Sequence, residues 1–305
     1  MTELTIPPRL AATVVRWEGD RGRAWLADLP GLVAALEAAW NLEIGAPFEP
    51  GGQVSWAAPA RRRADGLEVV LKVRLPHPDT DGEALGLQTW AGDGAVEVFA
   101  HDPARRAVLI ERCRPGTGLV ELGGTDAAVV AGGRLGARLH AATAPPELPT
   151  LASVLDRWAD ELAGRLQRTF VDPGLDRLAV ETMRVRPRAC TAPVLLHGDL
   201  NPTNVLAARR APWLAIDPQP MSGEAAYDGA RLVTQPDPLL GAEPAATLAR
   251  RLRLVRDAME IDGDGLALWC LVGAVEMGAA ARDQGEAAAA QGFAALARLV
   301  ARHLP

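Results

Sequence analysis

The sequence predicts an α+β protein with two lobes: a small N-terminal lobe built on a five-stranded antiparallel sheet, and a larger, mainly helical C-terminal lobe. Five short apolar or β-branched runs, with one helical segment among them, lie between about residues 44 and 111. Ala-, Leu- and Arg-rich helical patterns dominate the chain beyond residue 118. A chain of 305 residues can also bury two modest cores. We place the boundary between the lobes at residues 112 and 113.

The N-terminal lobe is expected to begin with a helical extension over about residues 20–42, which Pro30 can divide in two. The strands then follow at residues 44–48, 53–57, 68–73, 96–100 and 107–111. A helix over residues 80–90 separates the third strand from the fourth.

The C-terminal lobe is expected to be helical at about residues 126–142, 150–171, 173–185 and 243–303, with short strands and loops around residues 194–217. The longest apolar run, residues 266–275, is too short to cross a membrane and predicts a buried helix.

Composition narrows the class of protein. The net charge of −6 and the pI near 5.5 argue against a nucleic-acid partner. The three cysteines are odd in number and far apart, which favours a reducing compartment. No secretory signal pattern is visible at the N-terminus. We therefore expect a cytoplasmic protein, a monomer or weak dimer, with no membrane partner.

The most informative stretch runs from His197 to Asn204, with Asp217 a short hairpin later. Phosphoryl transfer needs a carboxylate that orients the attacking hydroxyl, and oxygen ligands that hold Mg²⁺ on the donor phosphates. Asp199 supplies the first, and Asn204 and Asp217 supply the second. As alternatives, Asn204 and Asp217 could be ordinary turn formers. His197 fits a structural brace better than a zinc ligand, because no further His or Cys lies nearby.

The chain contains a single lysine, Lys72, among its 32 basic residues. Lys72 lies in a strand-like apolar run, and a point charge on a strand suits contact with the α- and β-phosphates of a nucleotide. Its candidate partner is Glu83, eleven residues later. The alternative for Glu83 is a capping box with Thr80, which helix entry alone would explain.

Taken together, these motifs resemble the aminoglycoside phosphotransferases, and within them the streptomycin 6-kinase and hydroxyurea kinase branch. The matching pieces follow one another over nearly the whole length: Pro50-Gly51-Gly52-x-Val54-Ser55, Val70-Leu71-Lys72-Val73, Leu109 to Gly116, Leu196 to Leu206, and Trp213 to Pro218. The resemblance implies a bilobal, protein-kinase-like fold with ATP and Mg²⁺ as cofactors. One departure from protein kinases is Asp-Pro-Gln where they carry Asp-Phe-Gly.

The resemblance also implies further donor-site residues. Gly51 and Gly52 would let the backbone approach the ATP phosphates, and Ser55 could hydrogen-bond a phosphate oxygen. Glu111 and Cys113 fall where a linker between lobes would present backbone groups to the adenine.

Acceptor recognition is expected on the helical lobe. A streptomycin-like acceptor is cationic, so acidic side chains are the candidates: Glu224, Asp228, Glu260, Asp262, Asp264, Glu276 and Asp283. For any single member, a solvated loop between helices is the better explanation. In this fold, an acid at position 228 can instead brace the catalytic loop or favour a helix N-terminus.

These observations lead to three hypotheses. The first is a Mg²⁺-dependent ATP phosphotransferase acting on the 6-hydroxyl of streptomycin and thereby conferring resistance. The second keeps the kinase and changes the acceptor to hydroxyurea, another antibiotic or a small polar metabolite. The third is a nucleotide-binding protein without turnover. The first two require that Lys72, Asp199, Asn204 and Asp217 act on one nucleotide.

Overall fold

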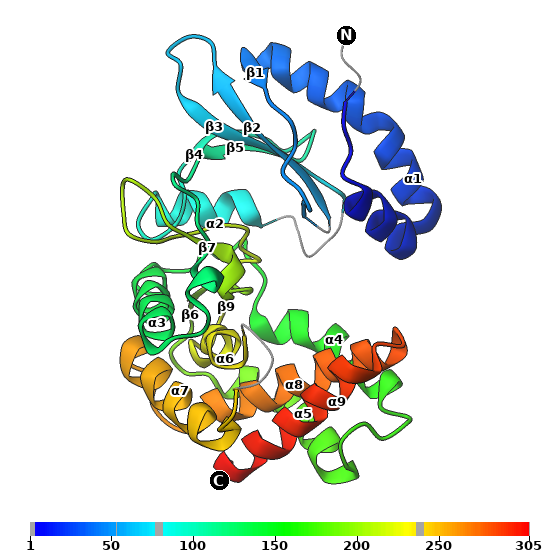
Figure 1. The fold of residues 1–305 in the computed structure, drawn as a ribbon, viewed down its shortest axis with the longest axis vertical. Coiled ribbons are helices and arrows are strands. Elements are labelled where there is room, and N and C mark those ends of the chain that lie inside the picture. The colour runs from blue at the N-terminus through cyan, green and yellow to red at the C-terminus, as the bar shows by residue number, and fades with distance from the viewer. Residues whose placement is uncertain (1–3, 53, 77–81, 236–240, 305) are drawn as a thin grey trace. The chain divides into compact units, whose positions relative to one another are not determined.

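A computed structural model of the chain describes residues 4–52, 54–76, 82–235 and 241–304 (Figure 1). The chain forms two compact units, one made of residues 1–92 with 96–114, the other of residues 93–95 with 115–305. The first unit holds a five-stranded antiparallel sheet, and the second is mostly helical. The α+β class predicted from the sequence is therefore confirmed. Each unit is described by itself below.

The sheet of the first unit has the strand order β1-β2-β3-β5-β4, with every neighbouring pair antiparallel. Its strands are β1 (Leu42–Ile44), β2 (Ser55–Arg62), β3 (Glu68–Arg74), β4 (Val98–Asp102) and β5 (Ala107–Glu111). The helices of this unit are α1 (Pro8–Ala39) and α2 (Glu83–Trp90).

Helix α1 begins twelve residues earlier than the sequence predicts and bends at Gly19, not at Pro30. Gly19 has φ +54°, a left-handed conformation that glycine adopts without a Cβ clash. A Cβ added to Gly22 would lie 2.5 Å from the Val14 carbonyl oxygen, so the two halves of the helix approach closely at this bend. The second half starts at Asp20, where the sequence places the helix.

Strand alternation gives the sheet two distinct faces. Trp56 of β2 pairs with Val73 of β3, and these side chains join the buried cluster that α1 covers with residues such as Leu29 and Leu36. The opposite face carries the alternate residues of β2 and β3, including Lys72. One face therefore packs into the core, and the other carries charged side chains such as Lys72 and Arg74.

The second unit is built from seven α-helices and two short two-stranded ribbons in its described part. The helices are α3 (Asp126–His140), α4 (Leu151–Arg165), α5 (Pro173–Ala189), α6 (Ala226–Thr234), α7 (Pro244–Met259), α8 (Gly265–Asp283) and α9 (Ala287–Val300). The strands are β6 (Val194–Leu196), β7 (Val205–Leu206), β8 (Leu214–Ala215) and β9 (Met221–Gly223), and short 3₁₀ turns lie at Leu119–Leu122, Pro202–Asn204 and Ala301–His303.

The two ribbons are nested. Strand β6 pairs with β9, and the hairpin of β7 and β8 lies between them in the sequence. Residues 197–204 therefore leave one ribbon and enter the other, and Asp217 follows the inner hairpin directly. The loop that carries the predicted catalytic residues is consequently fixed at both of its ends.

Among the described helices, α8 alone is long and apolar enough to cross a membrane by length and composition. In the 18-residue apolar segment of α8 that meets these criteria, 67% of the residues are buried inside the protein. Trp269, Leu271 and Val275 are among these, so α8 packs as a core helix, as its apolar run predicts. One such helix is weak support for a membrane span, because core helices pass the same test.

Candidate functional site

The predicted site residues fall into two groups, one in each unit. The first unit holds Lys72, Glu83 and the glycine-rich segment before β2. The second unit holds the loop from His197 to Asn204, together with Asp217 and the acidic candidates. The geometry of each group stands by itself.

In the first unit, Lys72 and Glu83 form a buried ion pair. Lys72 Nζ lies 2.8 Å from Glu83 Oε1, and the Glu83 side chain is fully buried. Glu83 is the first residue of α2, whose N-cap Gly82 has no side-chain cap, while Thr80 lies outside the described residues. Glu83 also forms an ion pair with Arg74, whose Nη1 lies 2.7 Å from Glu83 Oε2. The sequence does not single out Arg74.

The other predicted donor-site residues of this unit have defined places. Gly51 has φ +74°, and a Cβ on Gly52 would lie 2.8 Å from Ser55 Oγ, so this turn needs its glycines. Ser55 is buried at the start of β2. Glu111 ends β5 and accepts a hydrogen bond from the Glu97 backbone, and Cys113 is partly buried. Their contact with a nucleotide stays a prediction.

In the second unit, a buried carboxylate holds the start of the loop from His197 to Asn204. Asp228 of α6 accepts hydrogen bonds from the backbone N–H groups of His197 at 2.7 Å and Gly198 at 2.8 Å. His140 Nε2, at the end of α3, lies 3.0 Å from the same carboxylate. Because the Asp228 side chain is fully buried, the structure favours the loop brace over acceptor binding for this residue.

Burial alone would raise the pKa of Asp228, but hydrogen bonding from His140 and from the His197 backbone outweighs it and lowers the pKa overall. The carboxylate therefore stays charged inside the unit. A charge at this depth depends on its donors, because an unpaired buried charge is strongly destabilising.

His197 acts as a second brace within the loop. Its Nε2 lies 3.0 Å from the Ile216 carbonyl oxygen, and its Nδ1 accepts a hydrogen bond from the Asp199 backbone N–H at 3.3 Å. This pair of bonds matches a donating Nε2–H and an accepting Nδ1. Both ring nitrogens are occupied, which agrees with the structural role expected from the sequence.

Gly198 turns the chain between the two braces. Its φ is +80°, and an added Cβ would lie 2.0 Å from the Gln219 carbonyl oxygen, so no other residue fits here without moving the backbone. Asp199, the next residue, is partly exposed, whereas Asp228 is fully buried.

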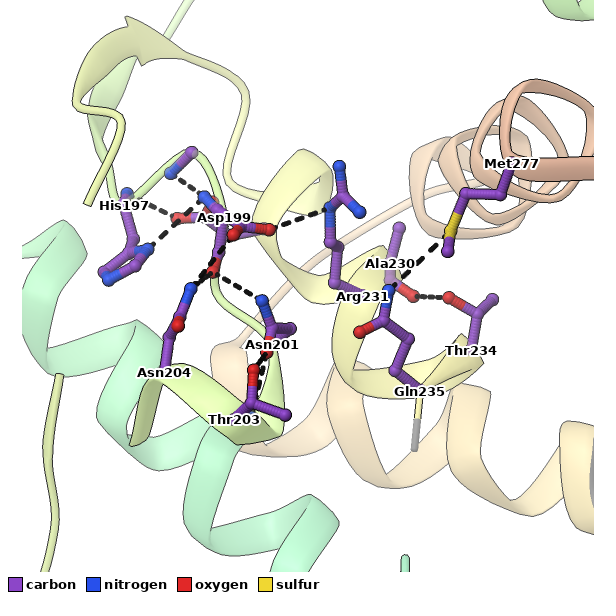
Figure 2. Close-up of polar contacts among 12 residues, drawn as sticks. His197, Asp199, Asn201, Thr203, Asn204, Ala230, Arg231, Thr234, Gln235 and Met277 are labelled. Carbon is purple, nitrogen blue, oxygen red and sulfur yellow. Dashed lines mark hydrogen bonds and ion pairs between the residues drawn. The ribbon is translucent and has the colours of Figure 1, made fainter. Parts of the chain in front are cut away.

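Two side chains contact the Asp199 carboxylate, and they approach it from opposite sides (Figure 2). Asn204 Nδ2 donates to Asp199 Oδ2 at 2.9 Å and to the Asp199 carbonyl oxygen at 3.0 Å. Arg231 Nε lies 3.4 Å from Asp199 Oδ1. The carboxylate is about a quarter exposed, at 26%, so it is held in place and still reachable.

The predicted metal ligands have the donor atoms that Mg²⁺ requires. Because Asn204 uses its amide nitrogen on Asp199, its amide oxygen is the atom left for a metal. Ile216 N–H bonds to the Asn204 carbonyl oxygen at 2.9 Å, and Asp217 follows with φ +56°. Among the described residues, no three His, Cys, Asp or Glu side chains gather as a metal site. One amide and one carboxylate oxygen fit an ion whose other ligands are donor phosphates and water.

The remaining acidic candidates divide by environment. Glu276 lies inside α8, where burial raises its pKa against the opposing effect of Arg231 and Arg165. Glu260 and Asp262 are exposed between α7 and α8. Asp283 ends α8 within 3.4 Å of Arg165.

Glu224 is engaged by other side chains. Arg186 of α5 binds its carboxylate through Nε at 2.8 Å and Nη2 at 2.7 Å, and Trp269 Nε1 donates to it at 2.9 Å. Arg186 Nη1 also reaches Asp264 at 3.1 Å. An acceptor cation would have to compete with Arg186 for both carboxylates.

Sequence reasoning misses four of these side chains: Arg74, His140, Arg186 and Arg231. In a chain with 31 arginines, no single one stands out by composition. His140 is 88 residues from Asp228, and only the packing of α3 beside α6 joins them. Two signals were available: Arg74 shares the Lys72 face of a strand, and Arg231 lies one helical turn after Asp228.

An oriented carboxylate, an amide beside it and a lysine–glutamate pair on an antiparallel sheet define a small-molecule phosphotransferase of the protein-kinase-like fold. A solved choline/ethanolamine kinase family protein from Mesorhizobium loti matches this fold with a TM-score of 0.62 and 16% identity, covering 93% of this chain and 97% of its own. Residues 48–285 match the aminoglycoside/hydroxyurea antibiotic resistance kinase family, and the chain belongs to that family. A kinase of this family uses ATP as its phosphoryl donor.

Two characterised relatives are similar over most of their length. A streptomycin 6-kinase of Streptomyces griseus is 33% identical over 278 residues, covering 87% of either chain. A hydroxyurea phosphotransferase of Kitasatospora aureofaciens is 36% identical over 231 residues, covering 73% of this chain and 66% of its own.

The brace at Asp228 yields a stability prediction. In Asp228→Asn, one amide oxygen remains to accept where a carboxylate served three donors, so the free energy of unfolding should fall by about 2 kcal/mol or more at pH 7. Since the folded-state pKa of Asp228 is lowered, its contribution is present above an unfolded pKa of about 3.9 and is lost as the pH falls through the folded value. Urea unfolding at pH 7.0, 5.0 and 3.5 measures this.

The matched control is Asp160→Asn, at a carboxylate that is 77% exposed and paired with Arg184. This variant should change stability by less than about 0.5 kcal/mol at each pH. Equal losses in the two variants, or a loss at position 228 that does not shrink at pH 3.5, would contradict the buried brace.

Proposed function

We propose that the protein transfers the γ-phosphoryl group of ATP to a hydroxyl of an aminoglycoside-type antibiotic, with the 6-hydroxyl of streptomycin as the acceptor, and so confers resistance. The observation that carries the proposal is the Asp199 carboxylate, held by Asn204 and Arg231 on a loop fixed by Asp228. The similarity to a streptomycin 6-kinase over 87% of the chain supports this acceptor.

The roles of the chain's residues follow from their chemistry. Asp199 accepts a hydrogen bond from the acceptor hydroxyl and takes its proton as the new O–P bond forms. The bond between the γ-phosphorus and its bridging oxygen breaks, and ADP leaves with that oxygen. We assign the donor phosphates to Lys72, held by Glu83. Asn204 and Asp217 would hold Mg²⁺, which when bound neutralises charge on the donor phosphates.

The second candidate acceptor is hydroxyurea. Its hydroxyl is attached to nitrogen in a small neutral molecule, so it needs no acidic rim. Two observations favour keeping it: the 36% identity to a hydroxyurea phosphotransferase, and the engagement of Glu224 by Arg186, with which a cationic acceptor would have to compete.

An acceptor panel tests the proposal. The purified protein with ATP and Mg²⁺ is given streptomycin, hydroxyurea, spectinomycin and a neutral sugar, and both ADP release and product mass are measured. We expect one added phosphoryl group on streptomycin, placed at the 6-hydroxyl by NMR. Transfer to hydroxyurea alone would establish the second candidate, and nucleotide binding without transfer to any acceptor would refute both.

Replacing Asp199 by Asn removes the proton acceptor and keeps the side-chain volume. We expect turnover to fall by about two to four orders of magnitude, the scale of losing a catalytic base, while the Kd for ATP changes by less than about threefold. The control Asp126→Asn, at an exposed carboxylate paired with Arg250, should keep its turnover. Normal turnover in Asp199→Asn would remove this residue from the catalytic role.

Replacing Lys72 by Arg keeps the charge and changes its shape. A planar guanidinium cannot take the place of a compact ammonium held against Glu83 in a buried site, so we expect kcat/KM for ATP to fall by about tenfold or more. The reverse exchange Arg62→Lys, on the neighbouring strand β2, should have no effect. An unimpaired Lys72→Arg enzyme would mean that the lone lysine has no special function.

A further inference from the structure

Arg74 shares the face of the sheet that carries Lys72. The two residues are two apart on β3, so their side chains point to the same side, away from the apolar face that α1 covers. In the register of the sheet, Ser55 of β2 lies opposite Arg74, and Ala57 lies opposite Lys72. Two cations and a hydroxyl therefore line one end of this face, next to the turn at Gly51 and Gly52.

Three buried charged side chains meet on this face. The side chains of Lys72, Arg74 and Glu83 are 7%, 8% and 0% exposed, respectively. One carboxylate faces two cations, at 2.8 Å from Lys72 Nζ and 2.7 Å from Arg74 Nη1. These three groups carry a formal charge of +1. Arg74 therefore adds a second cation to the pair of Lys72 and Glu83.

The Arg74 guanidinium also has hydrogen-bonding capacity left. Its Nε is buried and has no hydrogen-bond partner among the described residues. A buried N–H without an acceptor lowers stability. An anionic ligand with several oxygens would supply the missing acceptor, because a guanidinium presents its donors in a fork that matches phosphate oxygens.

We propose that Arg74 is a second cationic contact for the phosphates of the nucleotide donor, acting beside Lys72 on the same face of the sheet. This inference rests on the proposed function, since it assigns a further residue to the donor site. Glu83 then positions both cations. Its Oε1 binds the ammonium of Lys72, and its Oε2 binds the guanidinium of Arg74. Ser55 lies opposite Arg74, in register to add a neutral donor to the same phosphates.

A purely structural role for Arg74 predicts something different. If Arg74 only holds Glu83, its loss disturbs the site whichever nucleotide is bound. If Arg74 contacts phosphates, its loss matters more as the number of phosphates grows. A series of AMP, ADP and ATP therefore separates the two roles, and binding by calorimetry reads them without any transfer reaction.

The test is Arg74→Gln, which removes the charge and keeps a polar side chain. Losing a charge-assisted hydrogen bond to phosphate should weaken ATP binding by about tenfold or more, while AMP binding changes by less than about twofold. The control Arg105→Gln removes an exposed arginine from the turn before β5 in the same unit and should bind all three nucleotides as the wild type does. A thermal melt of each variant checks that it is folded.

Arg74→Lys keeps the inference testable if the glutamine variant does not fold. A lysine keeps a positive charge beside Glu83. Its ammonium is a compact point charge, however, so the forked contact of the guanidinium is lost. We expect ATP binding to fall by about threefold to tenfold, with AMP again unchanged within about twofold. In either variant, an unchanged Kd for ATP, or equal weakening of AMP and ATP binding, would overturn the assignment.

Failure of this inference can be told apart from failure of the proposed function. A wild-type protein that binds ATP and phosphorylates an acceptor, together with an Arg74 variant that has normal nucleotide affinities, refutes the inference alone. A wild-type protein that binds no nucleotide refutes both.

Discussion

The buried carboxylate of Asp228 is the constraint on which the loop from His197 to Asn204 depends. A charge in this position has no water to solvate it, so its donors must come from the chain. Two of them are consecutive backbone N–H groups, those of His197 and Gly198, and this pair fixes the direction in which the chain leaves β6. The left-handed turn at Gly198 and the outward position of Asp199 follow from that direction. Asn204 and Arg231 then hold a carboxylate whose position the backbone has already determined.

Sequence reasoning worked best where chemistry requires a fixed spacing. The loop from His197 to Asn204 and the pairing of Lys72 with Glu83 could be predicted, because a catalytic carboxylate, its amide neighbour and a strand lysine are rare combinations outside phosphoryl transfer. The braces that support them were harder to find. His140 reaches Asp228 across 88 residues, and Arg231 is one of many arginines on amphipathic helices. Their roles depend on which helices pack together, which a single sequence does not specify.

The fold shows the same division. The order of strands and helices follows from hydrophobic periodicity, whereas their ends do not. Helix α1 extends back to Pro8 because Leu10 and Val14 join the core on the sheet, an effect of tertiary packing that local propensity does not contain. Strand β2 continues to Arg62, past the predicted strand end at residue 57, because β1 and β3 pair with it on both sides. The bend falls at Gly19, since Pro30 is accommodated within a continuous helix.

The single lysine has a practical consequence. Every other cationic side chain apart from histidine is a guanidinium, so Lys72 is the only ε-amino group in the protein, and it lies beside the carboxylate of Glu83. Isotope labelling of lysine therefore places one NMR reporter in the whole molecule, and its signal needs no assignment. The environment of the Lys72 ammonium can be followed directly through nucleotide titration, in a chain of 305 residues where other resonances overlap.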